Sequence, residues 1–538
     1  MKVKQKLGVV TLVAISLLAA GCSKQNSKDE TKNSELNWAT TGEITTLDAS
    51  KVADTASMGA LVNMGEGLYR IDKTGKPKLA LADKVTVSKD KKHYDFYLRK
   101  TKWANNEDLT AEDFVTTYRR ISDPKTKSSS MGLMGLFKNG KDIVQGKKKV
   151  TSLGVSAPSK YHLHFDLQVP NTMLKEYLSL PSFYPQNSRI LKKAGSRYGT
   201  SSKYFVANGP FKIKKWDPNQ KNWVLIKNEN YWDKKHVYLK KINVQSNAST
   251  ITSYNLYQAG KSDNTFLDSS QIAANEKKKE FHDFPTYAIT RMDFNFKNKA
   301  LKNLKIRQAI AAAINRHELL KSLHSTSKPL LGLIPENYNK NPKTGTPLEK
   351  DAYVKEAVTY NLQRAKQLWS AGKKEENLKN LELTVLSDDS SSGEETAEYI
   401  QSNLSELPGL TVKVRHVPLT QQLALTAAKN YDLNIYSTST QIPSAIDLLN
   451  NFKSTTPQSP GWDNKEYDSL LTDAINKNGA DPIKQYQDYV KAEKLLMKQQ
   501  VTIPLFEINN SVLIKSKVKG YIFMPNYLEF DFKSVYVN

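Results

Sequence analysis

Cysteine is almost absent from this chain: Cys22 is the one cysteine among 538 residues. A lone cysteine excludes a disulfide within the chain, because a disulfide joins two thiols. Histidine is also sparse, with eight residues, and only His162 and His164 stand close together in the sequence. Two ligands do not make a metal site without further partners. We therefore expect no metal and no cofactor, and we place both histidines on one solvated face of a strand at residues 161–167.

The motifs of common enzymes are missing too. Gly260, Lys261 and Ser262 imitate the end of a phosphate-binding loop, but Asn255 occupies the position where such a loop needs a glycine. A Gly-x-Ser-x-Gly elbow for a serine nucleophile does not occur either. After residue 20 no apolar run reaches the length of about 20 residues that a membrane-spanning helix needs. These absences favour a binding protein with a globular body over an enzyme.

The N-terminal segment has the pattern of a secretory signal. Lysines alternate through the first six residues, a charge-free apolar run fills residues 7–20, and Gly21 and Cys22 follow. This arrangement resembles the lipobox of bacterial lipoproteins, in which the signal is removed and the cysteine thiol receives a diacylglyceryl group. We predict a signal peptide at residues 1–21 and lipidation of Cys22. The alternative is an ordinary secretory signal beside a chance cysteine.

A polar stretch follows the cysteine. Its side chains are too hydrophilic to enter a core, so residues 22–35 are predicted to be a flexible tether. Two acyl chains on Cys22 would anchor the chain stably. We expect a globular body held at the extracellular face of the cell membrane.

The net charge of +25 at pH 7 is spread along the chain as lysine rather than gathered into one arm. This distribution argues against nucleic acid as a partner. An attraction to the anionic polymers of a cell envelope and a merely solvated lysine-rich surface both remain open. The chain also carries 26 Tyr, 17 Phe and 7 Trp, many of them in short clusters beside Asn or Gly. Such clusters suit ligand binding, although core packing is the plainer use of most aromatic rings.

Strand-like and helix-like patterns alternate along the globular part, which predicts a mixed α/β protein. The clearest helix is expected at residues 301–323, where apolar residues recur at three- and four-residue steps. A second helix at residues 361–371 is expected to end at Gly372 as its C-cap. Farther along, a βαβ unit is expected, with strands at residues 381–386 and 410–414 and a helix at 394–404.

A series of distinctive segments runs in a fixed order along the chain. They are LVNMGEGLYRID at 61–72, HYDFYLR at 93–99, KWANN at 102–106, LTAEDFV at 109–115, NGPF at 208–211, KNENYW at 227–232, IRQAI at 306–310, AINR at 313–316, EYD at 466–468 and IPL at 503–505. In this order they resemble the extracellular solute-binding proteins of ABC importers for oligopeptides. The departures include Asn106, where the family usually has glycine, and Asn315, where it more often has Asp.

The resemblance implies a fold and a function. The fold would be α/β and bilobed, of the periplasmic-binding-protein-like type II (cluster C), with an extra inserted domain. Capture of an oligopeptide would close the two lobes, and a monomer would hand the ligand to the permease subunits of an ABC transporter. The predicted parts are lobe I at residues 36–72, 204–297 and 506–538, the inserted domain at 73–203, and lobe II at 298–505.

The resemblance also bears on the ligand. Peptide-binding relatives carry a lobe II segment with a tryptophan and an aspartate that pairs with the ligand's α-ammonium group. Aligned without gaps, this chain has Thr438 and Gln441 at those positions. A glutamine oxygen accepts a hydrogen bond but cannot neutralise a buried cation. We therefore predict weak dependence on a free α-amine, unless Asp447 or Glu66 takes the role or a shifted register removes Gln441 from the anchor position.

The candidate ligand-binding residues that follow from the resemblance are Glu66, Asn208, Gly209, Asn295, Tyr436, Thr438, Gln441 and Asp447. No catalytic residue is assigned. Three functional hypotheses stay open: general peptide uptake, a dedicated receptor for a signalling peptide, and a binding protein for a non-peptide or N-blocked solute. An exported enzyme or chaperone is disfavoured by the missing catalytic set.

Overall fold

The structure is a computed structural model that describes residues 34–247, 249–457, 459–527 and 529–538. The predicted signal peptide and Cys22 lie outside the described residues, as does the predicted tether up to residue 33. The tether was predicted to reach residue 35, but Glu35 already begins strand β1 (Glu35–Thr40), where it pairs with Lys241. Among the described helices, none combines the length and the apolar character that crossing a membrane requires.

Lobe I is built on a four-stranded sheet whose order is β1, β10 (Lys241–Ser246), β9 (Trp223–Lys227) and β8 (Phe211–Ile213). Strand β1 runs parallel to β10, an arrangement that requires a long connection such as the one that joins these two strands. Trp38 is buried, with its ring edge against Phe530 at a centroid distance of 4.9 Å. The smaller strands are β2 (Tyr69–Ile71), β3 (Pro77–Leu79), β17 (Val518–Lys519), β18 (Ile522–Met524), β19 (Glu529–Asp531) and β20 (Tyr536–Val537). The helices are α1 (Thr55–Met64), α6 (Thr250–Gln258) and α7 (Ser269–Asn275).

The inserted domain has its own four-stranded antiparallel sheet. The strand order is β4 (Ala82–Val87), β5 (His93–Leu98), β7 (His162–Asp166) and β6 (Val155–Ser159). Strands β5 and β7 alternate, with aromatic and aliphatic side chains on the buried face and histidine and aspartate on the other. Helix α2 (Ala111–Ser122) packs on the buried side and starts with a capping box between Thr110 and Asp113. The shorter helices are α3 (Gly140–Val144), α4 (Leu174–Tyr177) and α5 (Ser188–Ala194).

Lobe II is built on most of a six-stranded mixed sheet, whose other end reaches into lobe I. The strand order is β11 (Asn264–Phe266), β16 (Thr502–Ile514), β12 (Phe281–Phe294), β15 (Leu433–Ser439), β13 (Leu381–Asp388) and β14 (Leu410–Val417). The predicted βαβ unit is confirmed, because β13 and β14 are parallel and α13 (Ser391–Leu404) connects them. The other helices are α8 (Leu304–Ala313), α9 (Arg316–Ser322), α10 (Leu348–Asp351), α11 (Lys355–Val358), α12 (Leu362–Glu375), α14 (Leu419–Ala428), α15 (Ala445–Leu449), α16 (Lys465–Asn476) and α17 (Pro482–Lys498).

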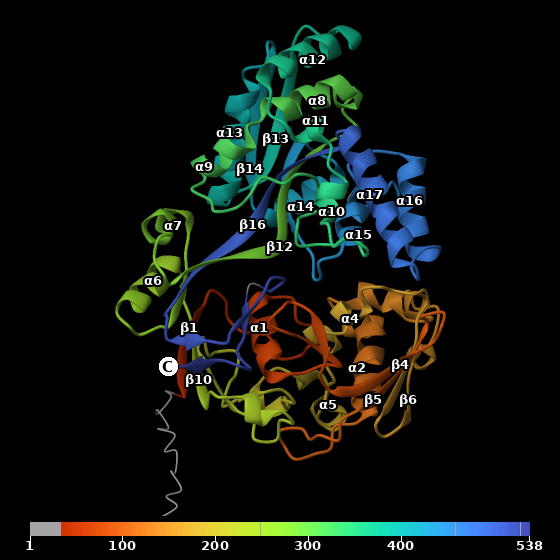
Figure 1. Ribbon diagram of the computed structural model, residues 1–538, viewed down its shortest axis with the longest axis vertical. Helices are drawn as coiled ribbons and strands as arrows, with labels where there is room; N and C mark the ends of the chain where they lie inside the picture. Colours follow the sequence, from red (N-terminus) through yellow and green to blue (C-terminus); the bar gives the residue numbers. More distant parts are fainter. Residues whose placement is uncertain (1–33, 248, 458, 528) are drawn as a thin grey trace, which may run out of the picture. The chain divides into compact units, whose positions relative to one another are not determined.

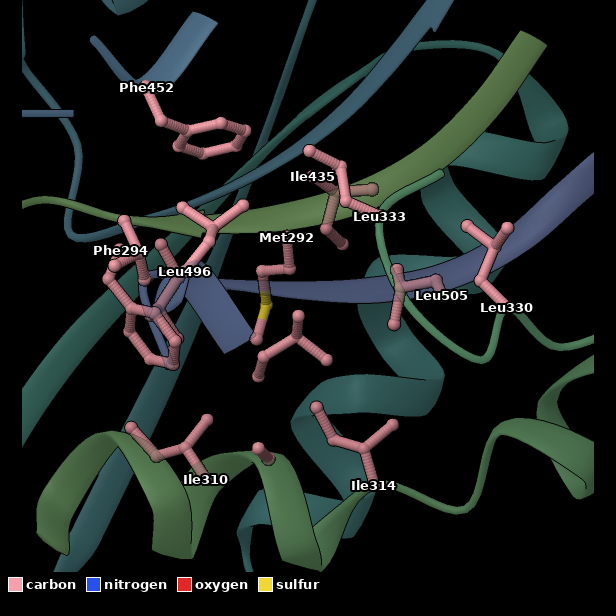
Figure 2. Packing of buried hydrophobic residues seen from close by; sticks show 14 of the residues in the cluster. Met292, Phe294, Ile310, Ile314, Leu330, Leu333, Ile435, Phe452, Leu496 and Leu505 are labelled. Atoms are coloured by element: carbon pink, nitrogen blue, oxygen red, sulfur yellow. The ribbon is translucent and has the colours of Figure 1, made fainter. Parts of the chain in front are cut away.

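The core of lobe II lies between this sheet and its helices. Figure 2 shows Ile310 and Ile314 pointing from the helical side toward Met292 of β12 and Leu505 of β16. All four side chains are buried. Burial of each large aliphatic side chain contributes about 1.5–3 kcal/mol, so this layer holds α8 firmly on the sheet.

The prediction of one continuous helix at residues 301–323 is wrong. The structure has α8 and α9 instead, with Ile314 in an extended conformation between them. Asn315 is the N-cap of α9, since its side chain accepts a hydrogen bond from the Glu318 backbone N–H. Arg316 is buried and donates to the carbonyls of Leu330 and Pro504, contacts that a straight helix would not provide.

The predicted C-cap at Gly372 is also wrong. Helix α12 continues to Glu375, and Gly372 lies inside it, buried. A Cβ atom there would stand 2.7 Å from Cγ1 of Ile306. The glycine allows α12 to pack closely on α8 and does not terminate the helix.

Strands β12 and β16 connect the two lobes. They run side by side as a long antiparallel pair, and their pairing is irregular between Pro285 and Ile289 (Figure 1). Residues at the start of β12 pair with the end of β16, whereas Ile289 and Phe294 pack in the core of lobe II. The change of lobe therefore falls within β12, not after residue 297 as the predicted boundary has it.

Candidate functional site

A cavity of about 400 Å³ lies where lobe I, the inserted domain and lobe II meet. Strand β12, the loop after β15 and the turn after β18 each contribute part of its wall. Its volume is in the range of ligand pockets, about 300–1,000 Å³. The lining residues are Ile71, Lys73, Gly75, Glu176, Ser179, Leu180, Phe284, Pro285, Tyr287, Gln441, Ile442, Pro443 and residues 521–527.

Aromatic rings form one wall of this cavity, which we call the interlobe cavity. Phe284 stacks on Phe523 with 4.6 Å between ring centroids, and Phe530 stands edge-on to Phe284 behind the wall. Tyr287 packs edge-to-face on Tyr338 at 5.8 Å. Such rings offer large apolar surfaces with little loss of conformational entropy on binding. The wall can therefore hold apolar side chains of many shapes.

Backbone groups and amides form the other part of the wall. The backbone carbonyl of Gln441 accepts a hydrogen bond from the Asn526 side chain at 2.9 Å, which connects the lobe II loop to the turn after β18. The Gln441 side chain itself is exposed. Gln441 is thus placed in the interlobe cavity, where the alignment predicted a ligand contact.

Two charged side chains line the interlobe cavity, Lys73 and Glu176. Desolvation by burial raises the pKa of the Glu176 carboxyl above its usual value. Its Oε2 atom has no hydrogen-bond partner among the described residues. Among the described residues that line the cavity, Glu176 supplies the one carboxyl group, a poorly solvated acid on α4 that the sequence reasoning did not select.

Asp447 lies in a neighbouring cavity of about 330 Å³ between the inserted domain and lobe II. The Tyr177 hydroxyl donates to its carboxylate at 3.3 Å and 3.4 Å. Burial raises the pKa of Asp447 to about 6, while the hydrogen bond from Tyr177 acts in the opposite direction. A second bridge, from the Thr172 hydroxyl to Gln485 Oε1 at 2.6 Å, joins the same two parts of the chain. Asp447 thus serves an interlobe contact in this conformation.

Glu66 is fully buried in lobe I and does not line the interlobe cavity itself. Its carboxylate accepts hydrogen bonds from the Tyr231 hydroxyl at 2.6 Å and from the Trp232 indole N–H, and Arg70 lies 3.6 Å away. It borders an adjoining cavity of about 490 Å³, which shares Ile71, Lys73, Tyr521 and Ile522 with the interlobe cavity. With these partners Glu66 holds together segments far apart in the sequence, and its proposed ligand role stays a prediction.

Asn208 and Gly209 contact the backbone at Gly65 and Glu66. The Asn208 side chain accepts from the Glu66 backbone N–H and donates to the Glu66 carbonyl, at 3.2 Å and 2.9 Å. A Cβ atom on Gly209 would stand 2.6 Å from the backbone of Gly65. Both residues fix the course of the chain, and neither lines the interlobe cavity.

The remaining candidates lie on lobe II. Asn295 donates to the carbonyls of Lys429 and Tyr431 and so ties the end of β12 to the segment before β15. Tyr436 lies on β15 under the guanidinium of Arg291, 5.2 Å from its ring centroid. Thr438, also on β15, pairs with Ile289 of β12. Of the eight candidates, only Gln441 lines the interlobe cavity, and the ligand roles of all eight stay predictions.

Residues that the sequence reasoning missed make up most of the cavity wall. They come from β12, α4 and the C-terminal turn, which lie far apart in the chain. The signal for them was the density of aromatic residues at 281–287 and 521–530. The density of aromatic residues alone could not show whether these rings line a cavity or fill a hydrophobic core.

Comparison with known proteins gives consistent matches. The profile described as bacterial extracellular solute-binding proteins, family 5 Middle, matches residues 76–460. The dipeptide-binding protein of Lactococcus lactis subsp. cremoris is 32% identical over the full length of both chains. OppA of Listeria monocytogenes bound to peptide has a TM-score of 0.76 and 31% identity, covering 94% of this chain and 99% of that one. The pheromone receptor PrgZ, whose mode of peptide binding is known, has a TM-score of 0.77 and 29% identity, covering 94% and 100%.

Proposed function

Since the chain belongs to the bacterial extracellular solute-binding proteins of family 5, we propose that it captures oligopeptides in the interlobe cavity and delivers them to the permease of an ABC importer. The family and the bilobed α/β fold class predicted from the sequence are confirmed. Members of the family bind solutes, so the site is one of recognition rather than of turnover. The likeness to peptide-binding relatives over the whole chain supports a peptide as the solute.

The interlobe cavity carries the proposal. Its apolar wall of Phe284, Tyr287 and Phe523 accommodates side chains, while the side-chain amides of Gln441 and Asn526 at the wall can meet the N–H and C=O groups that every peptide has. Recognition of the backbone gives affinity without a fixed sequence. The proposed ligand is therefore a peptide of broadly variable sequence.

Closure of the lobes follows from the way the chain connects them. The irregular pairing of β12 and β16 near Pro285 lies at the edge of the interlobe cavity. A β-bulge is a local weakness in a ladder, at which strands bend. Bending there would open the cavity for entry, and a bound peptide would favour the closed arrangement by contacting both sides.

The location of the protein is part of the proposal. The lysines, apolar run and Cys22 at the N-terminus support a lipoprotein held at the extracellular face of the cell membrane. A tether keeps the binding domain near its permease and raises its effective concentration there. We propose that the chain acts as a monomer.

A dedicated peptide receptor is the second candidate. The likeness to the pheromone receptor PrgZ covers 94% of this chain and favours it as specifically as the other matches favour general uptake. The two functions differ in the range of peptides bound, because a dedicated receptor selects one sequence.

Isothermal titration with synthetic peptides of graded length tests the proposal. We expect one binding site, and we expect Tyr287→Ala to weaken binding by about 1–2 kcal/mol, roughly five- to thirty-fold, because it removes an aromatic wall. Tyr360→Ala is the matched control, since Tyr360 is 44% exposed and lies outside the cavity wall. An absence of peptide binding, or equal effects of the two variants, would refute the proposed site.

A further inference from the structure

The outer face of the inserted domain's sheet carries a cluster of histidines and aspartates that peptide binding does not use. His93 on β5 lies directly opposite Asp166 on β7, and Asp95 lies opposite His164. Alternation along both strands sends these four side chains to the same face, while Phe96 and its neighbours fill the core on the other. Of this cluster, no member lines the interlobe cavity. The cluster is therefore separate from that cavity.

Three of these side chains converge on one point. The ligand atoms of His93, His164 and Asp166 all lie within 4.8 Å of one another. Asp166 Oδ1 is 2.6 Å from His93 Nδ1 and 3.1 Å from His164 Nε2. In a tetrahedral zinc site with bonds of about 2.0–2.1 Å, donor atoms lie about 3.3 Å apart. The carboxylate oxygen is therefore already near the required spacing from both nitrogens.

The two imidazole rings stand side by side on the outer face of the sheet. The rings of His93 and His164 are nearly parallel, with an interplanar angle of 17° and centroids 6.2 Å apart. His93 is half exposed, so a small rotation of its side chain can bring its nitrogen closer to that of His164. The fourth position of a tetrahedral site would face solvent and be filled by water.

Further carboxylates stand behind the two rings. Asp95 Oδ1 lies 2.8 Å from Nδ1 of His164, which is the nitrogen that the cluster leaves free. Asp90 Oδ2 lies 3.7 Å from Nε2 of His93, which is an ionic contact but too long for a hydrogen bond. A carboxylate on the outer nitrogen of a histidine fixes the tautomer that presents a lone pair to a metal and increases its basicity. The second partner of His164 is thus of the kind that metal-binding histidines have.

We propose that His93, His164 and Asp166 form a binding site for a divalent first-row transition-metal ion such as Zn²⁺ on the inserted domain. Two imidazoles and one carboxylate favour such an ion over Ca²⁺ or Mg²⁺, which prefer oxygen ligands alone. The ion would join β5 to β7 at the ends nearest residues 93 and 166. This inference does not depend on the proposed peptide function.

Zinc titration of the full chain, prepared without a polyhistidine tag and stripped with EDTA, tests the site. The wild type is expected to bind one equivalent of Zn²⁺ and to melt at a higher temperature with Zn²⁺ than with EDTA. His93→Ala and Asp166→Asn are each expected to weaken Zn²⁺ binding at least tenfold and to remove the rise in melting temperature. Melting in EDTA reports separately whether each variant remains folded.

His236→Ala is the matched control. The His236 side chain is 52% exposed, as is that of His93, and it also contacts an aspartate, Asp233, at 2.5 Å. We expect it to bind Zn²⁺ as the wild type does, as should Tyr287→Ala, the peptide-site variant. Failure of the wild type to bind Zn²⁺ saturably would overturn the proposal, and so would equal affinities of His93→Ala and His236→Ala.

Discussion

Acetylation of a peptide's N-terminus probes the most unusual residue of the interlobe cavity. Gln441 is a neutral, exposed side chain at the cavity wall, at the position where the alignment places an ammonium-binding aspartate in peptide-binding relatives. A hydrogen bond to a charged group contributes about 1.5–3 kcal/mol, and a neutral one about 0.5–1.5 kcal/mol. Without a charged partner, the amine gains little from the cavity. We expect acetylation to weaken binding by less than about 1.5 kcal/mol, roughly tenfold or less.

Gln441→Asp supplies the missing charge. An α-amino group has a pKa of about 7.7–8.0, so at about pH 6.5 the free peptide is mostly a cation. We expect Gln441→Asp to strengthen binding of the free peptide by about 1–2 kcal/mol and to leave the acetylated peptide unchanged. Gln441→Asn is the control, because it shortens the side chain without adding charge.

Isothermal titration of both peptides against the three proteins measures these differences. A loss of more than about 2 kcal/mol when the wild-type ligand is acetylated would refute the reasoning from Gln441. In that case Glu176→Gln would identify the partner, since Glu176 is the carboxyl group at the cavity wall. The acetylation penalty would then disappear in Glu176→Gln.

Three further predictions concern stability. Gly209→Ala should destabilise the fold by about 1–3 kcal/mol in urea, because its Cβ atom would meet the backbone of Gly65 at 2.6 Å, whereas Gly132→Ala, with open space around it, should be nearly neutral. Gly372→Ala should destabilise the fold by about 1 kcal/mol or more, because its Cβ atom would stand 2.7 Å from Cγ1 of Ile306 where α12 packs on α8. A gain in stability would contradict this and would mean that the higher helix propensity of alanine outweighs the steric contact. Burial raises the pKa of Glu493 from 4.5 to about 8, so its contribution to stability is complete below about pH 4.5 and is lost as the pH rises toward 8. Between about pH 6 and pH 8 the wild type should lose on the order of 2 kcal/mol more than Glu493→Gln, and parallel pH profiles of unfolding would contradict this.

Local sequence patterns predicted some of the fold well. The period-two alternation of β7 placed His162 and His164 on one face, and the structure confirms this, because both contact Asp95 at 2.7 Å and 2.8 Å. The βαβ unit was equally visible, since its strand and helix periods follow each other within a short stretch. Patterns of this kind depend on neighbours in the sequence.

The parts of the fold that depend on contacts between distant segments of the chain could not be predicted from the sequence. The break between α8 and α9 was hidden because Ile314 continues the apolar period, while the contacts of Arg316 with Pro504 come from a strand far along the chain. The family resemblance named Glu66 as a ligand-binding candidate but could not show that Tyr231 and Trp232 donate hydrogen bonds to its carboxylate. Spatial neighbours of this kind do not appear in one sequence.

The candidate site was the least predictable part. Gln441 was found because the alignment assigned a role to its position. The aromatic wall of the interlobe cavity and the carboxyl group of Glu176 come together from segments that no local pattern connects. His93, which faces His164 in the proposed metal site, was missed for the same reason, since it lies on another strand.

The central claim is that the interlobe cavity holds peptides, and the ligands carried by the protein test it most directly. The measurement is a mass spectrum of the small molecules released by acid from the full chain after purification under native conditions. The account predicts peptides, as a mixture of masses for general uptake or as one mass for a dedicated receptor. A released solute that is not a peptide, or protein free of peptide that also fails to bind added peptides, would contradict it.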